Sequence, residues 1–243
     1  MKDSKDISSY MDLLGSEAKS ASAPKYSMPR IVGVFGGTFD PVHFGHTKTI
    51  SELSSLISFK KVIVIPSAKP PHKQKVTASF EQRVTMTRLA FKNQKGVFID
   101  GREALRPGPS YAIDTVKDLL AKEKRSKIVL IMGSDAFAKI DTWHRWEDLL
   151  ALVDFIVIKR PNPTNLWKRR SFRLIKREND LEDFIHSKSI GRVFEVKLKP
   201  IRISSSKVRK DLALGKNVER LVGSKVKEYV LFHKLYGSKD FTK

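Results

Sequence analysis

The sequence predicts an α/β fold with a doubly wound parallel sheet. Six short apolar runs look like strands, most of them apolar on both faces, and in chain order they are IVGVF (31–35), VIVIP (62–66), VFID (97–100), IVLIMG (128–133), FIVIKR (155–160) and VFEVKLK (193–199). Segments with helical periodicity separate or follow them, at 44–57, 79–93, 110–124, 143–151, 205–214 and 224–236. Strands of this kind that alternate with helices are typical of a sheet covered by helices on both sides. Ligands of such folds bind at the carboxyl ends of the strands, so the loops that follow the strands are the place to look for a site.

The chain divides into one predicted domain and two short ends. Residues 1–29 are rich in Ser, Ala and Lys and show little periodicity, so we expect a disordered extension. Their four acidic residues argue against a mitochondrial transit peptide, which is usually poor in acids. Residues 30–237 are expected to form a single domain, with a tail at 238–243.

The composition excludes several kinds of chemistry. The 243 residues include no cysteine, which excludes disulfides, thiolate nucleophiles and thiolate metal sites. No apolar run approaches the roughly 18 residues of a membrane span. The N-terminus also lacks the apolar block of a secretory signal, so we expect a soluble, cytoplasmic protein without a membrane partner. The net charge of +21 favours anionic partners such as nucleotides or nucleic acid.

The first strand-to-helix connection holds an unusual motif, GGTFDPVHFGH, directly after IVGVF. Gly36 and Gly37 allow the main chain to turn sharply and a ligand to approach it closely. His43 and His46 are three residues apart, on one side of a first helical turn, and Gly45 between them carries no side chain that could block access. The free N–H groups and the positive dipole end of a helix start lie at the same place, so the motif predicts an anion site that suits phosphate.

Two other interpretations of this motif are less favoured. A zinc site built on two histidines three residues apart normally includes a third ligand, and the motif offers none in the right place. A plain turn is the second alternative, because Gly-Gly and Asp-Pro are both common turn residues.

A second candidate anion motif, ISSSKVR, follows the last predicted strand. Its three serines, Ser204, Ser205 and Ser206, can cap a helix while they offer hydroxyl and N–H groups to an anion. Arg209, one turn further on, faces the same way and supplies a guanidinium. Alone the pattern is more typical of an ordinary helix cap and a surface arginine, but together with the first loop it favours phosphate.

These motifs resemble those of a known enzyme superfamily. GGTFDPVHFGH resembles the phosphate-binding loop of the nucleotidyltransferases marked by His-x-Gly-His, and ISSSKVR resembles their second motif, usually Ile-Ser-Ser-Thr-x-Ile/Val-Arg. Within that superfamily the sequence is most similar to bacterial nicotinate-nucleotide adenylyltransferases, through PPHK (70–73), GPSYAIDTV (108–116) and GSDAFAKIDTWHRWEDL (133–149). The resemblance covers about residues 30–237 and implies a Rossmann-like nucleotidyltransferase fold with C-terminal helices.

The resemblance implies an activity and a set of phosphate-binding residues. Members of the family transfer the adenylyl group of ATP to nicotinate mononucleotide, giving deamido-NAD and pyrophosphate in NAD biosynthesis. The catalytic residues that it implies are His43, His46, Lys73 and Arg209. Further ATP-binding residues are Gly36, Gly37, Thr38, Phe39, Ser204, Ser205 and Ser206. Mg²⁺ is expected as a cofactor carried on ATP, held chiefly by phosphates and water, with no metal ligand from the protein.

The second substrate has its own implied residues, which are Tyr111, Ala112, Asp135, Trp143 and Arg160. The ring of Trp143 would stack on the nicotinate ring, whereas we assign Trp146 to the core. Many family members have Ser-Tyr-Thr where this chain has Ser-Tyr-Ala, and that Thr helps to hold the nicotinate carboxylate. The preference for the acid or the amide form of the mononucleotide is therefore left open.

Two classes of alternative function also stay open. Related enzymes that act on nicotinamide mononucleotide, phosphopantetheine or cytidine nucleotides share both phosphate motifs, although the Trp-containing loop favours the pyridine nucleotide. A nucleic-acid-binding protein is the alternative from another class, because the cluster WKRRSFRLIKR (167–177) lies in a strongly basic region at 159–210.

Overall fold

A parallel sheet of seven strands forms the centre of the structure, a computed structural model that describes residues 30–71, 76–159 and 176–238. The strands are β1 (Ile31–Gly37), β2 (Phe59–Pro66), β3 (Val97–Ile99), β4 (Lys127–Gly133), β5 (Asp154–Ile158), β6 (Lys176–Glu178) and β7 (Arg192–Val196). Their order across the sheet is β3-β2-β1-β4-β5-β7-β6, and every neighbouring pair is parallel. From β1 the chain adds β2 and β3 on one side, and it then crosses back to place β4 on the other side of β1. This reversal makes the carboxyl ends of β1 and β4 the switch point at which doubly wound folds bind ligands.

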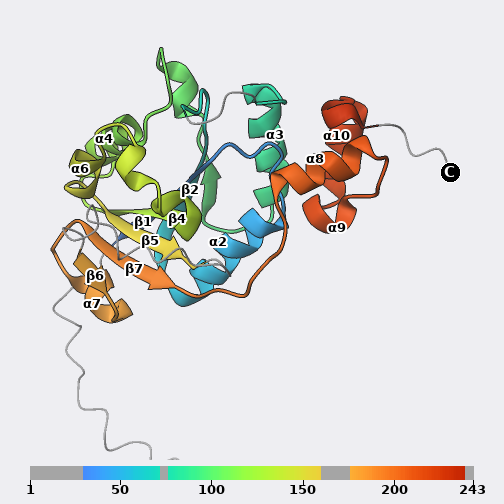
Figure 1. Cartoon of the computed structure of the whole chain (residues 1–243). Helices are drawn as coiled ribbons and strands as arrows, with labels where there is room; N and C mark the ends of the chain where they lie inside the picture. The colour runs from blue at the N-terminus through green and yellow to red at the C-terminus, as the bar shows by residue number, and fades with distance from the viewer. Residues whose placement is uncertain (1–29, 72–75, 160–175, 239–243) are drawn as a thin grey trace, which may run out of the picture.

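Helices cover both faces of the sheet. The α-helices are α2 (Phe44–Leu56), α3 (Phe80–Phe91), α4 (Ala112–Lys122), α5 (Ser134–Phe137), α6 (Trp146–Leu150), α7 (Leu181–His186), α8 (Ser205–Ala213), α9 (Glu219–Val222) and α10 (Ser224–Phe232). Short 3₁₀ turns are η1 (Arg102–Leu105), η2 (Ile140–Thr142) and η5 (Leu235–Gly237). Figure 1 shows α2 and α3 on one side of the sheet and α4 and α6 on the other, with α8, α9 and α10 grouped beyond α3.

The side chains of β1 show why this strand is apolar on both faces. Ile31 and Phe35 belong to one buried apolar cluster, which also contains residues of α2, α3 and the C-terminal helices. Val32 and Val34 point the other way, into a second cluster that contains residues of α4 and α6. Successive residues of a strand face opposite sides, so a sheet with two covered faces requires apolar residues at both alternate sets of positions.

The predicted doubly wound fold and its six strands are confirmed, with shifts of a few residues at their ends. The edge strand β6 and helix α7 were not predicted, because both lie within the basic region at 159–210, where apolar periodicity is weak. The predicted helices are shorter than expected, most clearly α4, α6 and α10. α6 starts at Trp146 after Arg145, whose φ of 53° is left-handed, and α10 ends at Phe232. The assignments of 1–29 as an extension and 239–243 as part of a tail lie outside the described residues and stay predictions.

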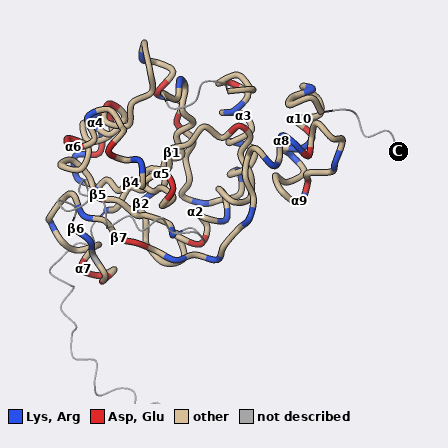
Figure 2. The backbone as a smooth tube through the Cα atoms, viewed as in Figure 1, with Lys and Arg blue, Asp and Glu red and all other residues tan. Residues whose placement is uncertain are grey.

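Charged residues are spread over the described part of the chain. Figure 2 shows Lys and Arg on most elements, with Asp and Glu between them, and several cations along the connection from β7 to α8. Within the ranges that the structure describes, no helix has the length and apolar character needed to cross a bilayer.

Candidate active site

The motif GGTFDPVHFGH lies at the switch point of the sheet. β1 ends at Gly37 and α2 begins at Phe44, so the motif is the connection between the central strand and its helix. The two glycines have different surroundings. A Cβ on Gly37 would lie 2.8 Å from the ring of Phe39, whereas a Cβ on Gly36 would meet nothing within 4 Å. Gly37 therefore serves the packing of the loop, whereas Gly36 faces open space.

The two histidines begin α2 together. His43 is the N-cap residue, His46 is the third helical residue, and their rings stack with centroids 3.8 Å apart. The backbone N–H of His43 donates a hydrogen bond to Nδ1 of His46, at 3.2 Å. Because Nδ1 accepts this bond, the neutral ring of His46 carries its proton on Nε2, where it is a donor.

Gly45 has a packing role rather than the access role that the sequence indicated. A Cβ at this position would lie 2.8 Å from the ring of His43, which is buried. The missing side chain therefore makes room for the His43 ring. His46 is only partly buried, and its ring meets that of Phe39 edge to face at 5.0 Å.

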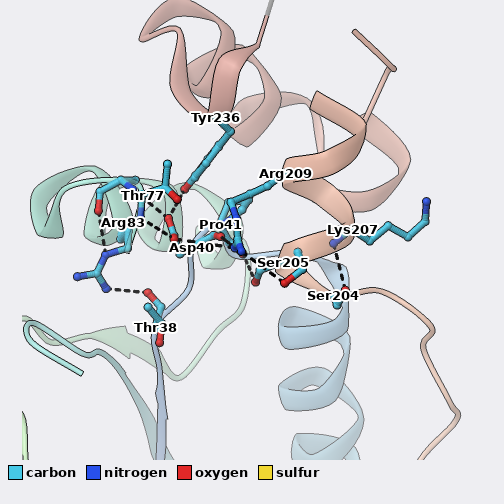
Figure 3. Close-up of polar contacts among 12 residues, drawn as sticks. Thr38, Asp40, Pro41, Thr77, Arg83, Ser204, Ser205, Lys207, Arg209 and Tyr236 are labelled. Atoms are coloured by element: carbon cyan, nitrogen blue, oxygen red, sulfur yellow. Dashed lines mark hydrogen bonds and ion pairs between the residues drawn. The ribbon is translucent and has the colours of Figure 1, made fainter. Parts of the chain in front are cut away.

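Asp40 is a buried carboxylate that joins this loop to two distant segments (Figure 3). Its oxygens accept hydrogen bonds from the backbone N–H groups of Thr77 (2.9 Å) and Ala78 (3.1 Å), just before α3. The hydroxyl of Tyr236, in η5, donates a third hydrogen bond at 2.9 Å. A buried carboxylate needs hydrogen-bond donors, and here the donors come from two segments that lie far from Asp40 in the chain.

Arg83 forms the second buried connection. Its side chain projects from α3, is 1% exposed, and donates hydrogen bonds to the main-chain carbonyls of Thr38 (2.7 Å), Ser67 (2.7 Å), Ala68 (3.3 Å) and Ala78 (3.3 Å). Burial lowers the pKa of Arg83 from its usual value, and the charge of Asp40 opposes that shift. One guanidinium thus holds the loop after β1 against the loop after β2.

The motif ISSSKVR meets the first loop in space, although the two are about 160 residues apart in the chain. Ser204 caps α8 by accepting a hydrogen bond from the N–H of Lys207, which confirms the predicted cap. Ser205 Oγ donates to the carbonyl of Pro41 at 2.9 Å, and Arg209 Nη1 donates to the carbonyl of Asp40 at 2.6 Å (Figure 3). The side chain of Arg209 remains 32% exposed, so part of its guanidinium faces solvent beside the loop.

The described residues expected at the second substrate lie in the connections that follow β3 and β4. Asp135 is exposed in α5, directly after β4, and Tyr111 is the N-cap residue of α4. The ring of Tyr111 stacks on that of His144 with centroids 4.2 Å apart. His144 was not singled out from the sequence, although it stands inside the Trp-containing motif.

The two tryptophans do not divide into one core and one surface residue. Trp143 and Trp146 are both partly buried, and both pack against the apolar cluster that contains residues of α4. Burial therefore does not support the separate assignment of Trp146 to the core.

Comparison with known proteins identifies the family. The cytidylyltransferase-like family model matches residues 34–211. A probable nicotinate-nucleotide adenylyltransferase from Pseudomonas syringae pv. tomato is 33% identical over 211 residues, which cover 86% of this chain and 95% of that protein. The chain belongs to the nicotinate-nucleotide adenylyltransferases of this family. A similar relative from Pseudomonas aeruginosa is 31% identical over 220 residues, covering 86% of this chain and 98% of that protein.

Solved structures support the fold of this nucleotidyltransferase. The nicotinic acid mononucleotide adenylyltransferase of Plasmodium falciparum, complexed with NaAD, has a TM-score of 0.67 at 18% identity and covers 86% of this chain and 98% of its own. A putative nicotinate-nucleotide adenylyltransferase from Vibrio parahaemolyticus has a TM-score of 0.59 at 16% identity, with 86% and 97% covered. The family resemblance seen in the sequence motifs is confirmed.

The structure of this adenylyltransferase brings together most of the predicted phosphate-binding residues. The first motif and ISSSKVR are in direct contact, as described above. Lys73 and Arg160 lie outside the described residues, so their positions stay predictions. Sequence reasoning missed Arg83 and Tyr236, because a single Arg or Tyr inside a helical pattern carries no sign of its distant partner.

Ser110 is a further residue that the sequence did not assign to the site. Its Oγ accepts hydrogen bonds from the backbone N–H groups of Ala68 (3.1 Å) and Lys69 (2.9 Å). These bonds attach the connection before α4, which ends in Tyr111, to the loop after β2. The loops expected to hold the two substrates are therefore joined to each other.

We expect Arg83→Met to destabilise the protein by about 3 kcal/mol or more, because it leaves buried carbonyls without donors and a buried carboxylate without its neighbouring cation. Urea unfolding followed by circular dichroism measures this loss. Arg88→Met is the matched control, since Arg88 is exposed near the end of the same helix and its replacement should change the free energy of unfolding by about 0.5 kcal/mol or less. Equal unfolding free energies for the two variants would contradict the role given to Arg83.

Proposed function

We propose that this enzyme transfers the adenylyl group of ATP to nicotinate mononucleotide, giving deamido-NAD and pyrophosphate. The observation that carries the proposal is the direct contact between the histidine loop after β1 and the serine-rich start of α8. It joins the loop that carries a half-buried His and begins α2 to the start of α8 and its Arg209, in the connection that follows the exposed Gly36. The names of the relatives supply the identity of the second substrate.

The reaction needs positioning and charge stabilisation more than a strong base. An oxygen of the mononucleotide phosphate attacks the α-phosphorus of ATP, and the bond from that phosphorus to the oxygen that bridges to the β-phosphorus breaks. The attacking oxygen is already anionic, so no proton must be removed from it, and the two electrons of the broken bond leave with pyrophosphate. Donors aimed at the transferring and leaving phosphates therefore supply most of the catalysis.

The described residues can supply such donors from both motifs. His46 presents Nε2–H at the first turn of α2, close to the free N–H groups and the positive end of that helix. Ser205, Ser206 and Arg209 come from the start of α8. In this proposal His46 contacts the α- and β-phosphates, and Arg209 contacts the phosphates that leave. His43, which is buried, contributes mainly through its stacking on His46.

Further groups of the proposal complete the two substrate sites. The main chain of Gly36, Gly37, Thr38 and Phe39 would line the ATP site, with Ser204 behind it and Lys73 as a mobile cation. The mononucleotide would lie beside Tyr111, Ala112, Asp135, Trp143 and Arg160. Stacking of the nicotinate ring on Trp143 would add roughly 0.5–1.5 kcal/mol beyond the burial of area.

A divalent ion, Mg²⁺ in this proposal, enters on the triphosphate. In the described ranges, no group of three or more His, Asp or Glu side chains is placed to hold a metal. The proposal gives the ion phosphate and water ligands, with the charge neutralisation that such an ion supplies to phosphates when it is bound.

Nucleic-acid binding stays the alternative from another class. Most of the cluster that suggested it, 167–175, lies outside the described residues. No observation in the described part of the chain favours it over the adenylyltransferase.

Pyrophosphate release in the presence of ATP and one second substrate tests the proposal. We expect faster turnover with nicotinate mononucleotide than with nicotinamide mononucleotide. We expect no turnover with phosphopantetheine or cytidine substrates, because the loops after β3 and β4 carry the aromatic residues expected for a pyridine ring. Absence of turnover with nicotinate mononucleotide at any Mg²⁺ concentration would refute the assignment. Faster turnover with the amide would refute the acid preference alone.

Gly36→Ala tests where the triphosphate lies. The added methyl group meets no protein atom within 4 Å, so the melting temperature should stay within about one degree of the parent. If the phosphates lie against this main chain, the KM for ATP should rise at least tenfold while the KM for the mononucleotide changes little.

Gly101→Ala is the matched control, because its new Cβ meets only the Phe80 ring at an ordinary 3.5 Å, in the turn after β3. An unchanged KM for ATP in Gly36→Ala would place the triphosphate elsewhere.

A further inference from the structure

In the part of the chain that the structure describes, η5 makes its polar contact with the loop after β1 through the hydroxyl of Tyr236. Tyr236 is 8% exposed and packs in the apolar cluster formed by β1, α2, α3 and the C-terminal helices. Its Oη donates to Oδ1 of Asp40 at 2.9 Å, across 196 positions of the chain (Figure 3). The proposed function assigns no role to this residue.

The backbone around Tyr236 is held in an unfavourable conformation. Lys234 has φ 49° and ψ 39°, and Tyr236 has φ 59° and ψ 26°, so two residues other than glycine adopt left-handed angles within three positions. Such angles are unfavourable for a residue with a Cβ. A helix that simply continued from α10 would avoid this cost. The chain instead leaves the helix after Phe232 and turns the tyrosine inward, so its burial and its bond to Asp40 offset the strain.

The pKa of Tyr236 determines that its hydroxyl is the donor in this hydrogen bond. Burial raises the pKa of Tyr236 well above its usual value, and the neighbouring charge of Asp40 raises it further. The hydroxyl therefore stays a donor throughout the pH range in which the enzyme works. Asp40 accepts from it and, on the same carboxylate, from the N–H groups of Thr77 and Ala78.

Asp40, which Tyr236 contacts, lies where the two proposed phosphate motifs meet. The backbone carbonyl of Asp40 accepts the hydrogen bond from Arg209, and the same loop leads into His43 and His46. The carboxylate of Asp40 also holds the N–H groups of Thr77 and Ala78, directly before α3. A rotation of this one carboxylate would break the bonds that join the loop after β1 to the segment before α3 and to η5.

We propose that Tyr236 is a positioning residue for adenylyl transfer: its hydroxyl fixes the Asp40 carboxylate, and through it the loop after β1 and the segment before α3, in the arrangement that grips the triphosphate. In this proposal the C-terminal turn η5 supports the active site without touching a substrate. This inference rests on the proposed function, because it assumes that ATP binds at the loop after β1.

Tyr236→Phe is the variant that separates positioning from packing. It keeps the buried ring and removes only the hydroxyl, so the protein should stay folded, with a modest drop in melting temperature. We expect kcat to fall about tenfold or more while the KM for nicotinate mononucleotide stays within twofold, because misplaced phosphate donors weaken the transition state more than they weaken binding of the second substrate.

Tyr229→Phe is the matched control. Tyr229 is a partly buried tyrosine of the neighbouring α10, packs against the same apolar cluster, and meets the ring of His233 at a tilt of 47°, with centroids 4.2 Å apart. We expect this variant to keep the kcat of the parent.

A second variant tests whether the hydroxyl acts through Asp40. If the hydroxyl acts through Asp40, Tyr236→Phe should lower kcat much less in the Asp40→Asn background than in the parent. The losses of the two single variants should then not multiply in the double variant. Multiplicative losses, or a Tyr236→Phe variant with the kcat of the parent, would overturn the inference. A drop in kcat equal to that of Tyr229→Phe would also overturn it, because it would reduce the effect to core packing.

Failure of the proposed function is distinguishable from failure of this inference. If the parent protein releases no pyrophosphate with nicotinate mononucleotide, the proposed reaction fails, and calorimetric binding of a non-hydrolysable ATP analogue with Mg²⁺ becomes the readout. Weaker binding to Tyr236→Phe than to the parent and Tyr229→Phe would support the positioning role. Equal affinities, or no binding to any of the three, would overturn it.

Discussion

The buried carboxylate of Asp40 holds together segments that the chain itself keeps far apart. It stands in the loop after the central strand and accepts hydrogen bonds from the start of α3 and from η5 near the C-terminus. A carboxylate removed from water is costly unless its oxygens find donors, and these donors are available only when the three segments meet. The need to satisfy one charged group thus enforces the arrangement of the whole site.

Arg83 meets the same requirement with the opposite charge. Its buried guanidinium donates to carbonyls in the loops after β1 and β2, which have no partners of their own in the sheet because the strands have ended. Strand ends at a switch point leave a crevice for a ligand, but they also leave main-chain groups unpaired. Asp40 and Arg83 pair such groups from within, and the space beside the main chain at Gly36 remains open.

The parts of the structure that follow local patterns could be predicted from the sequence. Both faces of β1 are covered, so its apolar run identified a central strand, and the serine run at 204–206 identified the start of α8. The rule that ligands bind in the loops after strands also pointed to both motifs, and the structure shows that they are in contact. The polar edge strand β6 and the inward turn at Tyr236 leave no such pattern, because they depend on contacts with residues far away in the chain. For the same reason the packing role of Gly45 became visible only beside the ring of His43.

Amide hydrogen exchange in Asp40→Asn tests most directly whether this carboxylate holds the site together. The substitution keeps the shape of the side chain but replaces one of the two accepting oxygens with an NH₂ donor. The side chain can then no longer accept both the bond from Thr77, on one oxygen, and the bonds from Ala78 and Tyr236, on the other, and the oxygen that remains is a weaker acceptor than a carboxylate oxygen. The account predicts faster exchange at the amides of Thr77 and Ala78 and in η5, while amides inside β1 and β4 keep their protection. Unchanged exchange at Thr77 and Ala78, or a uniform increase that includes the central strands, would contradict it.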